Sequence, residues 1–87
     1  MIQNMTQRGE TDLEMAVRRV AEARRTVEQQ RRLIARLKKA EKPTLHQRQT
    51  LLVLESILQI TKVYERMVRE EARAATAETD RKARRKI

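Results

Sequence analysis

The residues that could perform acid–base or metal chemistry are few and scattered. His46 is the only histidine, and the 87 residues include no cysteine. A general base needs a partner and a pocket, and a metal site needs several ligands at suitable spacing. The carboxylates are dispersed among arginines, and none shares a helical face with His46 at ligand spacing. We therefore expect His46 to be an ordinary surface residue, with no catalytic residue, metal site or cofactor, so the protein is not expected to be an enzyme.

The basic residues form a pattern that could bind a ligand. Arg18, Arg25, Arg32 and Lys39 recur every seven residues, so on a helix they form a stripe that could meet a phosphate backbone. The alternative interpretation is a solvated coiled-coil surface, with neighbouring arginines paired to glutamates across the helix contact. Tyr64 is the only aromatic residue, which leaves little to stack on bases. Nucleic-acid binding is therefore the less favoured interpretation, and it would be non-specific and salt-sensitive.

The composition favours long helices. The chain has one Gly, one Pro, no Phe and no Trp, and its formal net charge is +9. Its apolar residues are aliphatic and are interspersed with Arg, Lys, Glu and Gln, a mixture typical of coiled coils. No apolar run approaches the ~20 residues of a membrane span, and the first ten residues contain no apolar segment of a signal peptide. We expect a cytoplasmic protein without a membrane span.

A first helix is predicted for residues 11–41, after a flexible tail at 1–10. The run Thr11-Asp12-Leu13-Glu14 is a capping box, in which the Thr hydroxyl and the Glu carboxylate bind free backbone N–H groups. Apolar residues then follow a seven-residue repeat, which indicates a coiled-coil contact. Its eight seam positions are Leu13, Ala16, Val20, Ala23, Val27, Gln30, Ile34 and Leu37. Gln30 is either a tolerated amide or a polar residue that fixes the register.

A second helix is predicted for residues 45–76, after a turn at 42–44. Pro43 ends the first helix because the residue before a proline is disfavoured in helical conformation. Thr44-Leu45-His46-Gln47 provides a second capping box. Two long helices joined by a short turn pack antiparallel. The fold is therefore predicted to be all-α, an antiparallel two-helix hairpin, with a basic frayed tail at 77–87.

The second helix is too apolar for one partner. At about 100° per residue, its apolar residues cover more than half of the helical wheel, whereas contact with one helix needs a stripe of only about 100°. Exposed apolar surface of this size marks an interface. We expect self-association into a homodimeric four-helix bundle or a higher homo-oligomer, with another protein as the alternative partner. The predicted interface residues are Leu51, Leu54, Ile57, Leu58, Ile60, Tyr64 and Val68.

Residues 12–70 resemble a group of small helical proteins of rhizobia and related alphaproteobacteria. The resemblance rests on the opening DLEMA, on LIARL towards the end of the first helix, and on LLVLE in the second. It implies a bacterial setting and a helical hairpin, and it brings no assigned activity. The leading hypothesis is thus a non-enzymatic helical interaction and oligomerisation module. The alternative is a non-specific nucleic-acid-binding or regulatory protein that uses the basic stripe.

Overall fold

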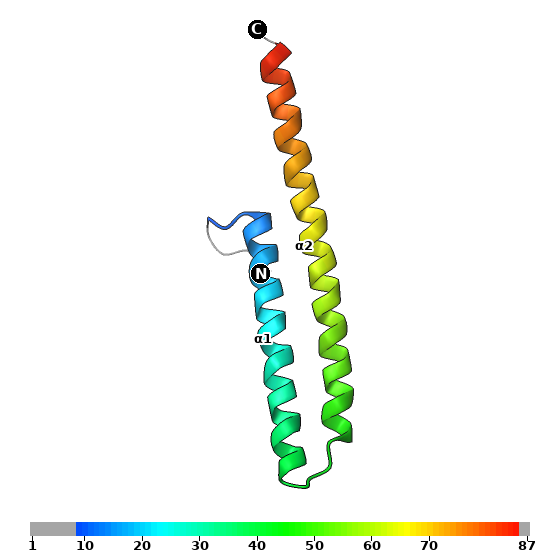
Figure 1. The fold of residues 1–87 in the computed structure, drawn as a ribbon. Helices are drawn as coiled ribbons and strands as arrows, with labels where there is room; N and C mark the ends of the chain where they lie inside the picture. Colours follow the sequence, from blue (N-terminus) through cyan, green and yellow to red (C-terminus); the bar gives the residue numbers. More distant parts are fainter. Residues whose placement is uncertain (1–8, 86–87) are drawn as a thin grey trace, which may run out of the picture.

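The structure, a computed structural model, describes residues 9–85. It contains two helices, α1 (Asp12–Lys39) and α2 (Leu45–Arg85). The helices lie side by side and antiparallel, and α2 continues well beyond the start of α1 (Figure 1). The molecule measures 71 × 29 × 15 Å, so it is long and thin. The predicted all-α hairpin is confirmed.

The start of α1 is fixed as its sequence predicts. The Thr11 hydroxyl accepts from the Glu14 backbone N–H, and the Glu14 carboxylate accepts from the Thr11 N–H, both at 3.0 Å. This capping box satisfies two of the N–H groups that a helix start leaves unpaired. Asp12 and Glu14 also place negative charge at the positive end of the helix dipole.

The contact between the helices follows the predicted seam of α1. Ala16, Val20, Val27 and Ile34 are buried, and the other four seam residues are half-buried. On α2, seven of the half-buried positions recur at alternating spacings of four and three, as expected for the facing half of a coiled coil. They are Gln47, Leu51, Leu54, Leu58, Thr61, Glu65 and Val68. We call these residues the inward seam.

The turn is a helix C-cap of the Schellman type. The Lys42 N–H donates to the Leu37 carbonyl and the Glu41 N–H donates to the Lys38 carbonyl, the pair of hydrogen bonds that defines this motif. Glu41 has φ 58°, in the left-handed region where glycine is preferred. Pro43 follows directly and prevents the helix from continuing.

Two details of the second helix differ from the sequence-based expectations. Thr44 makes no side-chain hydrogen bond within the part of the chain that the structure describes. Its carbonyl accepts from Arg48, while the Gln47 side chain is engaged with Gln30. The helix also runs to Arg85, where an end near residue 76 and a frayed segment were predicted. Residues 1–8 of the predicted N-terminal tail, and residues 86 and 87, lie outside the described residues.

Candidate interaction surface on the second helix

Between residues 52 and 67, α2 has seven large apolar side chains that lie outside the inward seam. Each is between 46% and 67% exposed, although residues of this kind usually lie inside a fold. We call this group the outward face. Its members are Leu52, Val53, Ile57, Ile60, Val63, Tyr64 and Met67.

The outward face contains a second coiled-coil repeat. Val53, Ile57, Ile60, Tyr64 and Met67 alternate at spacings of four and three, which is the spacing of a helix-packing seam. At about 100° per residue, this outward seam is rotated by about 110° from the inward seam. One helix thus carries two contact surfaces, and α1 covers one of them.

The predicted interface residues divide between these two surfaces. Leu51, Leu54, Leu58 and Val68 are half-buried and belong to the inward seam. Ile57, Ile60 and Tyr64 are exposed and lie on the outward face. Leu52, Val53, Val63 and Met67 complete that face, and they are not among the predicted interface residues. The second four-and-three repeat would have identified Val53 and Met67, whereas Leu52 and Val63 lie beside that repeat.

Polar contacts between the helices show which surface α1 covers. The Gln30 side-chain amide donates to the Gln47 backbone carbonyl at 2.9 Å. Farther along the hairpin, Arg31 donates to Glu55 at 2.8 Å. Both contacts use residues on or beside the inward seam. Gln30 therefore bridges the two helices, as the register-fixing interpretation of this residue requires.

A groove lies where the outward face meets the N-terminal half of α1. Its lining combines apolar side chains of both helices with one cation. The lining residues are Met15, Ala16, Arg19, Ile60, Thr61 and Tyr64. The Nε atom of Arg19 is buried without a hydrogen-bond partner. The groove is thus an apolar hollow beside the middle of the outward seam.

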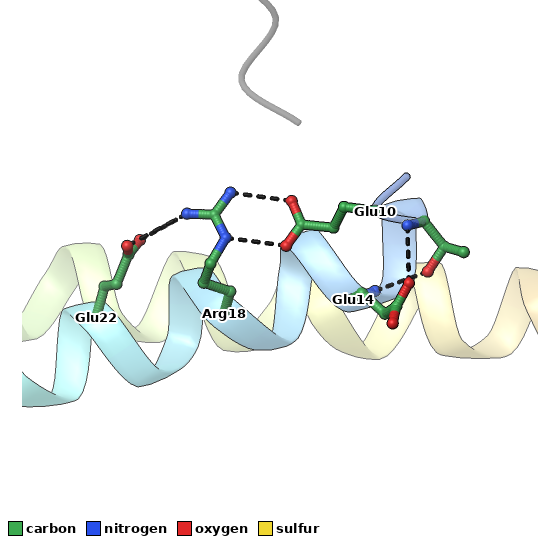
Figure 2. Close-up of polar contacts among 5 residues, drawn as sticks. Glu10, Glu14, Arg18 and Glu22 are labelled. Atoms are coloured by element: carbon green, nitrogen blue, oxygen red, sulfur yellow. Dashed lines mark hydrogen bonds and ion pairs between the residues drawn. The ribbon is translucent and has the colours of Figure 1, made fainter. Parts of the chain in front are cut away.

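The basic stripe of α1 is partly occupied by ion pairs within the chain. Arg18 donates to both carboxylate oxygens of Glu10, at 2.9 and 3.1 Å, and also to Glu22 (Figure 2). The Glu10 hydrogen bond raises the pKa of Arg18 above its ordinary value. Glu10, expected in a flexible tail, is thereby held against α1.

The other three residues of the stripe differ in their contacts. Arg32 pairs with Glu28 at 3.5 Å. Arg25 and Lys39 are exposed and have no ion pair among residues 9–85. Half of the predicted polyanion-binding set is thus engaged by neighbouring carboxylates, and half is open to solvent.

His46 and the carboxylates are the residues that the sequence analysis considered for acid–base or metal chemistry. His46 is exposed at the start of α2. Among residues 9–85, no group of three or more His, Asp or Glu side chains is placed to hold a metal ion. Neither described helix has a stretch long and apolar enough to cross a bilayer.

Comparison with known proteins places the chain in no family. The sequence matches no protein-family model, and neither a curated protein nor a solved structure is significantly similar to it. The resemblance to small alphaproteobacterial proteins therefore stays a prediction.

Proposed function

We propose that the protein is a non-enzymatic oligomerisation module that self-associates through the outward face of α2. The observation that carries this proposal is that α2 contains no fully buried residue within the described structure. Its apolar side chains are arranged as a second packing seam, and the hairpin leaves that seam uncovered. Two hairpins joined there form a four-helix bundle with both α2 helices at its centre.

The small core of a single chain supports the proposal. Among residues 9–85, the four buried residues are one alanine, two valines and one isoleucine, all in α1. Ordering the backbone costs about 1–2 kcal/mol per residue, and a two-helix hairpin with so few buried side chains does little to offset that cost. Burial of the outward face would supply the missing apolar contact at about 25 cal/mol per Å².

The exposed surface area of the chain also supports self-association. A compact monomer of 10.3 kDa exposes about 5,400 Å², whereas this chain exposes 7580 Å². A stable protein–protein interface removes about 800 Å² from each partner. The excess over a compact monomer is roughly 2,200 Å², so the hairpin has ample surface for such an interface.

The test is the solution mass of the wild type and of the double variant Ile57→Glu, Ile60→Glu, measured by light scattering behind a sizing column. Both residues lie in the outward seam, so two buried carboxylates would oppose association. The matched control is Gln59→Glu with Arg66→Gln, which makes the same net charge change on exposed positions of α2. We expect two or more chains for the wild type and the control.

The double variant is expected to have the mass of one chain. Circular dichroism of the same samples reports whether loss of association also unfolds the hairpin, and either result fits the proposal as long as the mass falls. A wild-type mass of one chain at every concentration would overturn it. So would a double variant that keeps the wild-type mass.

A second candidate function is non-specific binding to a polyanion. It is favoured by Arg25 and Lys39, which carry no ion pair in the described part of the chain, and by the net charge of +9. Such binding would use the side of α1 that faces away from α2, so it is compatible with association through α2.

A further inference from the structure

We infer that the outward face pairs with the same face of a second copy in antiparallel orientation, around a two-fold axis beside Ile60. The inference rests on the proposed self-association and adds its geometry. The outward seam runs from Val53 to Met67, and Ile60 is its middle residue. A two-fold interface is self-complementary, so an antiparallel pair centred there places every residue of one seam opposite the other seam.

The side-chain sizes along the seam fit this arrangement. In the antiparallel pair, Val53 lies opposite Met67 of the second copy and Ile57 lies opposite its Tyr64. The two Ile60 side chains meet at the axis. Each layer then combines a larger and a smaller residue or two of medium size, which fills a core evenly. In a parallel pair, Val53 would meet Val53 and Tyr64 would meet Tyr64, so one end of the seam would be underfilled and the other crowded.

The charges beyond the apolar segment disfavour the parallel pair. The same four-and-three repeat continues through Glu71, Ala74, Glu78, Arg81 and Arg85. A parallel pair would place each of the four charged residues opposite its own copy, and like charges at facing positions are destabilising. In the antiparallel pair, Glu71 faces Thr50 and Ala74 faces His46. The seam then contains no pair of like charges along its whole length.

The hairpin and its groove also suit the antiparallel pair. Because α1 and α2 are antiparallel (Figure 1), an antiparallel pair of α2 helices makes the four helices alternate in direction. Alternation places opposite ends of helix dipoles side by side, which is favourable. The groove beside Ile60 and Tyr64 lies close to the two-fold axis, where a side chain of the second copy can enter it.

Cysteine crosslinking tests the orientation, because the chain has no cysteine of its own. The two variants are Val53→Cys and Met67→Cys, each tested alone and after both are mixed, unfolded and refolded together. In the antiparallel pair, the two copies of position 53 are about 21 Å apart, whereas positions 53 and 67 face each other. A disulfide needs Cα atoms within about 7 Å, so a short thiol crosslinker is used beside oxidation. The control is Gln59→Cys, on the exposed polar side of α2.

We expect the mixture to yield the mixed 53–67 dimer, identified by its intact mass, and each single variant to stay uncrosslinked. Crosslinked dimers of Val53→Cys alone would overturn the antiparallel pair while leaving self-association intact. Crosslinking by Gln59→Cys but by neither seam variant would show that a different face is used. A wild-type mass of one chain would overturn the proposed function itself, so the two failures are distinguishable.

Discussion

At the scale of single residues, the turn contains a position at which the sequence is not optimal. Glu41, the residue after the C-cap of α1, adopts φ 58°, a conformation that costs a non-glycine residue about 1–2 kcal/mol. Glycine avoids this cost, although it loses about 0.5–1 kcal/mol through its more flexible unfolded state. Glu41→Gly is therefore expected to raise the free energy of unfolding by up to about 1 kcal/mol.

Urea unfolding followed by circular dichroism measures this change. The control is Glu41→Ala, which removes the same carboxylate but keeps a Cβ atom. We expect no gain in stability from the alanine variant. Equal stabilisation by both variants would show that loss of the carboxylate, and not the backbone conformation, is responsible.

Gln30 provides a second test at this scale. Its side-chain amide donates to the backbone carbonyl of Gln47 at 2.9 Å and lies 3.4 Å from the Gln47 side-chain oxygen. The backbone contact is the shorter one and does not depend on the Gln47 side chain. We expect Gln30→Ala to lower the free energy of unfolding by about 1 kcal/mol.

Gln47→Ala should cost clearly less, because the carbonyl that accepts from Gln30 remains. Both variants lose a similar part of a half-buried side chain, so the pair is well matched. Unfolding curves of both, measured at one chain concentration, provide the comparison. A larger loss for Gln47→Ala would contradict the assignment of the backbone carbonyl as the main acceptor.

At the scale of elements, the sequence determines α1 more clearly than α2. The seven-residue repeat of α1 marks one stripe of mostly apolar residues on a largely polar helix, so its eight positions could be predicted. The second helix is apolar over most of its circumference between residues 51 and 68. Leu51, Leu54 and Leu58 therefore could not be separated from Ile57 and Ile60 by hydrophobicity. Only pairing with α1 distinguishes the two seams, and that pairing depends on contacts such as Arg31 with Glu55.

The length of α2 also has a local explanation. No glycine or proline follows Pro43, and residues 72–85 consist mostly of alanine, arginine, lysine and glutamate, which favour helix. Pairs one turn apart add support, as in Arg69 with Glu65 and Arg81 with Glu78. The predicted end near residue 76 followed the loss of large apolar side chains, which limits packing but does not stop a helix.

The end of α2 is therefore expected to contribute little to the fold. Every described residue from Glu70 onward is exposed, and Leu13, near the start of α1, borders a hollow whose lining extends only to Asp80. Deletion of residues 81–87 should change the free energy of unfolding by no more than about 0.5 kcal/mol. It should leave the number of chains per assembly, derived from the solution mass, unchanged.

Unfolding curves and light scattering of the truncated chain check this expectation. Deletion of residues 69–87 is the comparison, because it removes the part of α2 that borders Leu13. The longer deletion should destabilise the hairpin. If the shorter deletion alone caused dissociation, the association surface would extend into the end of α2 and the outward face would be insufficient.

At the scale of the whole molecule, the outward face and the basic stripe lie on different helices. The outward face belongs to α2, and the basic stripe belongs to α1, in which nine basic residues outnumber four acidic ones. Its basic stripe occupies the positions farthest from the inward seam. Association through α2 would thus leave the stripe of each copy open to solvent, and a dimer would present two such stripes to a polyanion.

The contacts of the stripe predict which of its residues matter for such binding. Arg25 and Lys39 have no ion pair among the described residues, whereas Arg18 and Arg32 are paired with glutamates. A paired arginine must give up or share its carboxylate before it contacts a phosphate. One double variant carries Arg25→Gln and Lys39→Gln, and the other carries Arg18→Gln and Arg32→Gln. Both variants remove the same charge, so they form a matched comparison.

We expect the first pair of substitutions to weaken binding to random-sequence duplex DNA more than the second. Each lost phosphate contact should reduce the slope of log K against log salt concentration by about one. Fluorescence anisotropy at several salt concentrations measures both the affinity and this slope. Equal losses for the two pairs would mean that DNA responds to the net charge of +9 and not to the open positions of the stripe. No binding by the wild type at low salt would mean that the stripe is a solvated surface, and association through α2 would remain as the function to test.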